Sequence, residues 1–551
     1  MRRALLFSAL IIVGAAVWAS FGSAGTKKTA QSSKGTTSVT ISNEQGTTWT
    51  CGFSPFNGDV NSLSFGPVYE ELVFVNGLKS GATTNWLASG YKWSNGNKTL
   101  TFTIRSGVKW TDGKPFSADD VVFTYKLLKK DPGLDLNADW AVLKSVNKQG
   151  NKVVFNFKTS AVPYFYYIGA QTPIVAKHIW SSIKNPVTYK DTHPVGTGPF
   201  KMSSCSPQVI KYTKNSGYWQ KGLPKLDTIY YPAFTSNDPA NQQLASGKAQ
   251  WGSQFIPNIK AYYSSKSSNN HYWFPPLVNV NIFINLKDPI LSNVAVRRAI
   301  AYAIDRGKVS RIGEYSYEPA SNQTGIVTPT FSSWLDKGLA SKITYNPAKA
   351  VSILQKAGFK RSGGVFHTKS GKPLSFRIIN IGGYSDWVAS VQVIQQQLKA
   401  VGIKIKPENL SSTTFDSNAY NGKFQLMYNG NESGGPAPYY ELRQLLYSKN
   451  SAPIGKTASS NWERYYNPAV DKLIEQYGAT TDSARQHAIV KKLEAAMVND
   501  VPVIPVTEGV DWYQYNTKSI TGWVTQSDPY AKPAAYEIPD WGVLAMHLRP
   551  K

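Results

Sequence analysis

The sequence contains few of the residues that usually mark a metal site or a catalytic thiol, with two cysteines and six histidines among 551 residues. The histidines are dispersed without the spacing of zinc or nickel ligands, so direct metal coordination has no support. Neither an H-E-x-x-H pattern nor a nucleophile elbow occurs. We therefore predict a protein without metal, cofactor or catalytic residues.

Charged side chains are also scarce, at 17% of the chain, whereas aromatic side chains reach 13%. A disordered chain would have few such large side chains to bury, so the composition predicts a folded protein. The length exceeds what one core supports and indicates two or three domains. Aromatic residues also line ligand clefts, although a large aromatic core explains them equally well.

Acidic residues are few relative to basic ones, 34 against 60, which gives a formal net charge of +26. A nucleic-acid-binding protein usually concentrates such charge in a patch, an arm or a basic helix. Here the lysines are scattered, mostly one or two at a time. We interpret them as a solvated basic surface and predict no nucleic-acid partner.

A long apolar run, Ala4 to Phe21, follows two arginines at the start of the chain. It is typical of a signal peptide with cleavage near Ala24, although its 18 residues leave an uncleaved anchor open. No cysteine follows the run as a lipid acceptor. We expect residues 1–24 to direct export to the periplasm or cell surface without lipobox lipidation, and residues 25–37 to be a flexible tether.

Residues 99–130 show the clearest local pattern. Leu100, Phe102 and Ile104 alternate with polar residues, which is typical of a half-buried strand. Ser117 and Asp120 then have the spacing of a helix capping box. The segment therefore predicts a strand, a loop and a capped helix.

Ordered motifs extend from this segment along most of the chain. Phe102 to Phe123 reads F-x-I-R-x-G-V-K-W-x-D-G-x-P-F-x-A-D-D-V-V-F, residues 194–200 read P-V-G-T-G-P-F, and residues 294–306 read V-A-V-R-R-A-I-A-Y-A-I-D-R. Together they resemble the extracytoplasmic solute-binding proteins of family 5, the peptide, opine and nickel group that serves ABC importers. By the same resemblance, Val68 to Val75 is expected to be a helix with a Y-E-x-L core.

The resemblance implies an α/β, type II binding-protein fold of the cluster C type, with two lobes and an inserted extra domain. A ligand held between the lobes would stabilise their closed state and be passed to a membrane permease. We expect a monomer. Because no P-loop is present, the energy for transport would come from a separate ATPase. The expected ranges are 38–60, 195–278 and 507–551 for lobe I, 61–194 for the inserted domain and 279–506 for lobe II.

Amide and aromatic residues near the expected lobe crossings are candidates for ligand contact, since amides both donate and accept hydrogen bonds. Asn279 and Asn281 lie two apart and so share one strand face. A core position is the ordinary alternative for the aromatic residues. The candidates are Phe53, Trp251, Gln254, Asn279, Asn281, Tyr428, Asn429, Asn431, Glu432, Tyr439 and Trp512.

One loop departs from the peptide-binding pattern. Many peptide-binding relatives have W-x-x-D-Y there, with an aspartate that pairs with the amino terminus of the peptide. Residues 431–436 read N-E-S-G-G-P instead, so that position falls near Gly434, with Glu432 as a candidate substitute. A peptide ranks first as ligand because it is the commonest in the family. An oligosaccharide receptor of the same fold, an exported hydrolase and a sensor remain alternatives.

Cys51 and Cys205 are the only cysteines. The resemblance places both in the same domain. In an oxidising compartment they would form either a disulfide or two buried thiols, and sequence alone does not decide between these.

Overall fold

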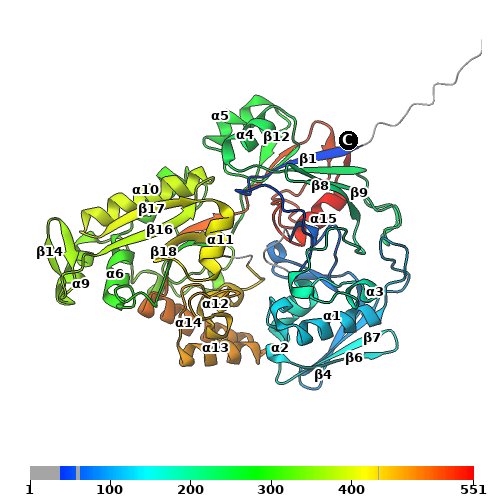
Figure 1. Cartoon of the computed structure of the whole chain (residues 1–551), viewed down its shortest axis with the longest axis horizontal. Coiled ribbons are helices and arrows are strands. Elements are labelled where there is room, and N and C mark those ends of the chain that lie inside the picture. Colours follow the sequence, from blue (N-terminus) through cyan, green and yellow to red (C-terminus); the bar gives the residue numbers. More distant parts are fainter. Residues whose placement is uncertain (1–36, 57–61, 432–433) are drawn as a thin grey trace, which may run out of the picture. The chain divides into compact units, whose positions relative to one another are not determined.

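The computed structural model describes residues 37–56, 62–431 and 434–551. The predicted leader, the tether before residue 37 and Glu432 lie outside the described residues. The described part is a mixed α/β structure with three sheets of four or more strands (Figure 1). No helix within it is long and apolar enough to cross a membrane.

A seven-stranded sheet gathers strands from three separate parts of the sequence. Its central strand β1 runs parallel to both neighbours, β10 and β11. The carboxyl ends of β1 and β11 therefore meet at the same edge. In spatial order the strands are β12 (Asn270–Tyr272), β20 (Gln514–Asn516), β11 (Trp251–Gly252), β1 (Ser38–Ser42), β10 (Thr228–Pro232), β9 (Val209–Lys214) and β8 (Phe200–Ser206).

A five-stranded sheet lies among the later residues. Strand β16 runs parallel to β17 and β18, whereas β13 runs antiparallel to β18 and β19. Helix α10 packs on β16 and β17. The spatial order is β17 (Lys404–Leu410), β16 (Ser375–Ile381), β18 (Leu426–Gly430), β13 (Pro276–Ile284) and β19 (Val503–Val510), and the helices of this region include α6 (Val294–Ala303), α7 (Arg306–Gly313), α9 (Pro347–Lys356) and α10 (Ser385–Ala400).

A four-stranded antiparallel sheet contains the segment with the clearest sequence pattern. Its order is β4 (Ala88–Ser94), β5 (Thr99–Ile104), β7 (Lys152–Phe157) and β6 (Leu143–Gln149), and helix α1 (Ala118–Lys130) packs on β6 and β7. Burial alternates along β5 as predicted. The Ser117 backbone N–H donates to Asp120 over 2.9 Å, which completes the capping box. The predicted strand, loop and capped helix are confirmed.

The expected helix at Val68 to Val75 is wrong, because the segment forms turns and then strand β2 (Val73–Asn76). Its apolar side chains are buried on all sides, and its backbone bonds to distant segments; the Val68 carbonyl, for example, accepts from Gly198 N over 2.9 Å. The Glu70 carboxylate accepts from Trp86 Nε1 and from the Tyr218 hydroxyl, each over 2.7 Å. Tertiary bonding thus replaces the helical bonding that the motif suggested.

The remaining elements are short or cover the sheets. The strands form two-stranded ladders, namely β2 with β3 (Ala82–Asn85), β14 (Lys360–Ser362) with β15 (Val365–His367), and β21 (Ile520–Thr521) with β22 (Arg549–Pro550). The helices are α2 (Asp139–Val142), α3 (Lys177–Trp180), α4 (Asn237–Ala245), α5 (Ile259–Tyr262), α8 (Lys337–Ala340), α11 (Ser412–Tyr420), α12 (Pro438–Leu446), α13 (Pro468–Gly478), α14 (Ser483–Asp500) and α15 (Asp540–His547).

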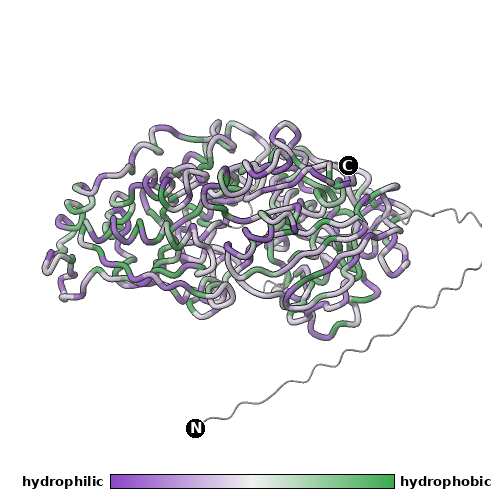
Figure 2. Tube along the Cα trace, turned by 90° about the horizontal axis from the view of Figure 1, so that it is seen from above, coloured by the Kyte–Doolittle hydropathy of each residue, from purple (hydrophilic) through white to green (hydrophobic). Residues whose placement is uncertain are grey.

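Hydrophobic and hydrophilic stretches alternate along the whole trace in Figure 2, and many of the apolar residues are buried. One buried cluster surrounds the five-stranded sheet and includes Ile282, Ile300 and Ile394. Many aromatic residues also belong to the core, for example Trp251 and Trp541. The high aromatic content therefore reflects packing to a large extent.

Cys51 and Cys205 are joined by a disulfide, with their Cα atoms 5.7 Å apart. Cys205 lies in β8, the edge strand of the seven-stranded sheet, and Cys51 lies in the loop after β1. The bond ties this loop to the sheet edge.

Candidate functional site

A cavity of about 400 Å³ is lined by residues from both large sheets. Its volume falls within the range of small-molecule sites. Most of its polar lining residues follow the last residue of a strand. The strand directions of the two sheets therefore determine where the cavity lies.

On one side, the lining residues follow two parallel neighbours of the seven-stranded sheet. Residues 43–45 follow β1 and residues 253–255 follow β11, and these strands pair through Ser42 and Gly252. Ligands in open α/β sheets characteristically bind at the carboxyl ends of parallel strands. The Gln254 side chain is fixed here, since its Nε2 donates to Ser42 Oγ over 3.3 Å.

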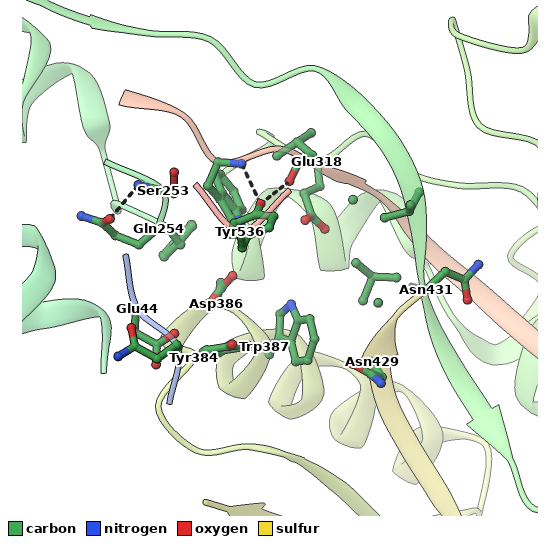
Figure 3. Close-up of a pocket in the computed structure, with 18 of the residues that line it drawn as sticks. Glu44, Ser253, Gln254, Glu318, Tyr384, Asp386, Trp387, Asn429, Asn431 and Tyr536 are labelled. Carbon is green, nitrogen blue, oxygen red and sulfur yellow. Dashed lines mark hydrogen bonds between the residues drawn. The ribbon is translucent and has the colours of Figure 1, made fainter. Parts of the chain in front are cut away.

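On the other side, the lining residues follow parallel neighbours of the five-stranded sheet. Tyr384, Asp386 and Trp387 follow β16 at the start of α10, and Asn429 and Asn431 lie at the end of β18. In Figure 3, Asp386 and Trp387 lie between the Ser253 side of the cavity and the Asn429 side. The carboxyl ends of strands from two sheets thus contribute to one site.

Strands β13 and β19 form a further wall, through Val278, Val280, Gly509 and Val510. The chain passes from the seven-stranded sheet into β13, and it returns to the seven-stranded sheet after β19. Just beyond β13 and β19 these two connections bond to each other, with Trp273 N donating to the Tyr513 carbonyl and Asp511 N to the Pro275 carbonyl, each over 3.0 Å. The two crossings are therefore adjacent.

Asn237, at the start of α4, bonds directly to the opposite side of the cavity. Its Nδ2 donates to Ser385 Oγ over 3.0 Å and to Asp386 Oδ1 over 3.3 Å. Its backbone N–H points to the Gly383 carbonyl at 3.4 Å. These contacts join the segment between β10 and β11 to the start of α10.

Aromatic rings occupy much of the cavity lining. Trp387 packs edge-on against Tyr384 and Tyr428, with centroid distances of 5.0 and 5.7 Å. Trp512 packs edge-on against Phe255 at 5.4 Å. Rings that are fixed in this way present flat apolar faces beside amide groups, which suits the faces and edges of sugar rings. The aromatic lining residues are Phe255, Tyr384, Trp387, Tyr420, Trp462, Trp512 and Tyr536.

Four carboxyl groups also line the cavity, from Glu44, Glu318, Asp386 and Asp416. Burial, and after it the negative charge of Asp386, raises the pKa of Glu44 to about 9. Burial likewise raises the pKa of Glu318 to about 8 and those of Asp386 and Asp416 to about 6. None of the described lining residues is Lys, Arg or His. The site therefore holds four carboxyl groups, of which the raised pKa values keep Glu44 and Glu318 protonated at neutral pH.

Four of the candidates from the sequence line this cavity, namely Gln254, Asn429, Asn431 and Trp512. Asn279 and Asn281 lie behind it with no exposed surface. Asn281 Nδ2 donates to Asn431 Oδ1 over 3.0 Å, so its contact with the cavity is indirect. Asn279 Nδ2 donates to the Gly325 carbonyl over 2.9 Å.

The other aromatic candidates occupy core positions and do not line the cavity. Phe53, Trp251, Tyr428 and Tyr439 have no exposed surface. Trp251 Nε1 donates to the Pro533 carbonyl over 3.1 Å, and Tyr439 stacks on Tyr477 at 4.1 Å. The ring of Tyr428 packs edge-on against the ring of Trp387.

Sequence reasoning missed Glu44, Asp386 and Trp387. A partial signal was present, because Glu44 lies two residues after β1, and Asp386 and Trp387 lie five and six residues after β16. Nothing in the sequence, however, indicates that these strands end at the same place. Within the described ranges, no group of three or more His, Cys, Asp or Glu side chains is arranged to hold a metal ion.

Comparison with known proteins identifies the family. The model of the bacterial extracellular solute-binding proteins, family 5, matches residues 82–453. The chain belongs to this family. The predicted resemblance is confirmed, and with it the type II binding-protein fold and the role of an extracytoplasmic substrate-binding component of an ABC importer.

Individual family 5 proteins are similar over most of their length. The oligopeptide-binding protein AppA of Bacillus subtilis is 28% identical over 460 residues, which cover 78% of this chain and 81% of AppA. The glutathione-binding protein GsiB of Salmonella typhi is 26% identical over 469 residues, covering 80% and 83%.

Solved structures of family 5 proteins superpose closely. The periplasmic oligopeptide-binding protein of Thermotoga maritima with bound mannohexaose has a TM-score of 0.87 at 26% identity, covering 94% of this chain and 99% of that one. AppA of Bacillus subtilis in complex with a nonapeptide has a TM-score of 0.80 at 22% identity, with the same coverage. Structures of this fold thus hold ligands of two chemical classes.

Proposed function

We propose that this family 5 receptor captures a short oligosaccharide in the cavity between the two sheets. The observation that carries the proposal is the cavity lining, which combines aromatic faces, amides and carboxyl groups. Sugar rings present apolar faces that pack on aromatic rings, and their hydroxyls both donate and accept hydrogen bonds. A bound mannohexaose in a structural neighbour at 26% identity supports this choice.

A peptide is the second candidate, supported by the names of AppA and other relatives. A free peptide brings a terminal carboxylate, and a buried carboxylate without a cationic partner is costly. No described lining residue supplies that cation. A peptide would therefore bind only with its carboxyl end outside the cavity.

We further propose that the cavity closes on its ligand. We take residues 38–60, 195–278 and 507–551 as lobe I and residues 279–506 as lobe II. The first set contains the seven-stranded sheet, and the second contains the five-stranded sheet apart from the first residues of β13 and the last residues of β19. A ligand that touches the lining of both lobes stabilises the closed state by its differential affinity. The adjacent crossings at residues 273–275 and 511–513 support a hinge at that point. The inserted domain is residues 61–194.

The receptor then delivers the ligand unaltered to a permease. We propose that it does so as an exported monomer that binds no nucleic acid. The first 24 residues would direct export.

A thermal-shift screen tests the proposed ligand class. A ligand that binds only the folded state raises the melting temperature by mass action. We expect oligosaccharides of two to four rings to raise it by several degrees, and free tripeptides to raise it less. Ligand that is recovered intact at one per chain by mass spectrometry would exclude a hydrolase. If no saccharide shifts the melting temperature and peptides do, the second candidate replaces the first.

The variant Trp387→Ala tests the site itself. Loss of one aromatic face should lower the affinity for a saccharide at least tenfold. Trp334→Ala is a matched control, because Trp334 stacks on His487 outside the cavity. Equal losses in the two variants would contradict the site.

A further inference from the structure

Helix α12 of lobe II places a buried arginine against the inserted domain. Arg443 is 3% exposed, and its Nη2 donates to the Asn137 carbonyl over 3.4 Å. Its Cζ lies 4.9 Å from the ring centre of Tyr167 and 5.6 Å from that of Tyr164. A buried charge is costly unless other groups compensate it, and the faces of aromatic rings attract a cation at such distances. The inserted domain therefore supplies the partners of this arginine.

Two acids of the inserted domain lie near the same guanidinium group. Burial raises the pKa of both Asp135 and Asp139, and the charge of Arg443 opposes that rise in each case. Asp139 lies in α2 and has no exposed surface. An arginine of lobe II is thus received among acids and aromatic rings that all belong to residues 61–194.

A second side chain of α12 lies in this interface. The Tyr440 hydroxyl donates to the Pro163 carbonyl over 2.6 Å. Its ring packs edge-on against Tyr166 and Tyr167, with centroid distances of 4.8 and 5.2 Å. Tyr440 and Arg443 are three residues apart and so lie on the same face of the helix. This face of α12 contacts the inserted domain.

The inserted domain is itself fixed to lobe I. Phe200 N donates to the Pro67 carbonyl over 2.9 Å, and the Tyr218 hydroxyl donates to the Glu70 carboxylate over 2.7 Å. The inserted domain should therefore move together with lobe I. Its contacts with α12 would then form when the two lobes close and break when they open.

Helix α12 is also connected to the ligand cavity, through Glu441. The Oε1 atom of Glu441 accepts from Asn279 Nδ2 over 2.7 Å and also from Asn431 Nδ2. Asn431 lines the cavity. The same helix thus contacts the inserted domain through two side chains and holds an amide of the cavity through a third.

We propose that Arg443 and Tyr440 form a latch, which binds the inserted domain and stabilises the closed receptor without touching the ligand. The inference rests on the closure proposed above. Because every group of the latch belongs to the protein, it forms without ligand, and part of the ligand-free population is already closed. The latch also slows the release of a bound ligand, which escapes only from the open state.

Pulsed electron paramagnetic resonance of spin labels tests the latch without any ligand. The exposed positions Lys144 on β6 and Lys472 on α13 become labelling sites through Lys144→Cys and Lys472→Cys, one in the inserted domain and one in lobe II. The native cysteines are joined in a disulfide and do not take a label. We expect two label distances in the ligand-free parent, of which the shorter belongs to the closed state.

Arg443→Met removes the charge of the latch and keeps a long apolar side chain. We expect the closed fraction of the ligand-free protein to fall about fivefold in this variant, because the attraction to the tyrosine rings is lost. A parent without the shorter distance, or an equal closed fraction in the variant, would overturn the latch. If Arg443→Met fails to fold, Tyr440→Phe replaces it in this measurement.

Tyr440→Phe separates the latch from a general loss of stability. It removes one bond between a hydroxyl and a carbonyl and keeps the ring. Tyr302→Phe is the matched control, since the Tyr302 hydroxyl donates to the Lys342 carbonyl over 2.7 Å within lobe II. We expect mannotriose to dissociate about threefold faster from Tyr440→Phe, the effect of one hydrogen bond, and at the parent rate from Tyr302→Phe.

Stopped-flow fluorescence measures these dissociation rates, and a melting curve shows that each variant is folded. Equal dissociation rates in Tyr440→Phe and Tyr302→Phe would overturn the role of Tyr440. If mannotriose does not bind the parent, the proposed saccharide ligand is wrong, whereas the label distances still decide whether the latch exists.

Discussion

At the scale of single residues, the buried acids of the cavity affect stability as well as binding. Burial and the charge of Asp386 raise the pKa of Glu44 from 4.5 to about 9. The folded state therefore keeps a proton that the unfolded state releases above pH 4.5, so this stabilising contribution is complete below that pH and is lost as the pH rises towards 9. Glu318 acts in the same direction, with a pKa of about 8.

We predict that the ligand-free protein melts at a lower temperature at pH 9 than at pH 5, and that Glu44→Gln reduces this difference. The glutamine is uncharged at every pH, so residue 44 no longer contributes to the change of melting temperature with pH. Differential scanning calorimetry across this range measures both proteins. If the melting temperature of the variant falls with pH as steeply as that of the parent, the raised pKa of Glu44 is contradicted.

Asn281 illustrates a buried residue that acts through a neighbour. Its Nδ2 donates to the Asn279 carbonyl over 3.1 Å and to Asn431 Oδ1 over 3.0 Å. Asn281→Ala leaves Asn431 Oδ1 without its donor, whereas the Asn279 carbonyl keeps its bond from the Asn431 backbone N–H over 2.9 Å. We expect a cost of about 1–3 kcal/mol of unfolding free energy. We also expect a several-fold loss of ligand affinity, because Asn431 lines the cavity.

Urea unfolding and calorimetry measure the two effects of Asn281→Ala. Asn147→Ala serves as control, since Asn147 is exposed on β6. Unchanged affinity together with reduced stability would remove Asn281 from the binding function and leave it a structural role.

At the scale of elements, local physics determines those that the sequence predicts well. The capping box of α1 and the alternation along β5 are both encoded within a few residues. The same holds for α10, which ends before Gly402 with its positive φ of 83°, and for β17 after it. The segment at Val68 to Val75 could not be predicted in this way, because its structure depends on Trp86, Gly198 and Tyr218, which are distant in sequence.

The disulfide joins an element edge to a loop, and its contribution can be tested directly. Cys51 and Cys205 are separated by 154 residues, so the bond closes a long loop and restricts the unfolded chain. We predict that the double variant Cys51→Ser, Cys205→Ser loses about 2–5 kcal/mol of unfolding free energy. Melting with and without a reducing agent checks this. The reducing agent should destabilise the parent and leave the variant unchanged.

At the scale of the whole described chain, the order of the motifs predicts the family and its fold, but not the site. Glu44, Gln254, Asp386 and Asn431 come from four segments that are far apart in sequence. They meet because β1 pairs with β11 and β16 pairs with β18 in parallel. Strand pairing between distant segments has no local signal, so candidates chosen by residue type and by their place near the expected lobe crossings included core residues such as Trp251.

The bond between Asn237 and Asp386 allows closure itself to be tested. Asn237→Asp places a second carboxylate next to Asp386 Oδ1, where the donor now lies at 3.3 Å. Residue 237 is the first residue of α4, where an acidic side chain stabilises the helix, so the variant should remain folded. The repulsion acts only when the two sides of the cavity are in contact, and it therefore disfavours the closed state.

We predict that Asn237→Asp binds saccharide at least tenfold more weakly than the parent. At a saccharide concentration that saturates the parent, the variant should have the larger radius of gyration. Small-angle scattering and calorimetry measure the two quantities. Asp238→Asn is the control, because Asp238 is exposed on the same helix and its change removes a charge away from the cavity. Weaker binding with an unchanged radius of gyration would mean that residue 237 acts through ligand contacts alone. A larger radius of gyration would mean that closure depends on the contact between residues 237 and 386.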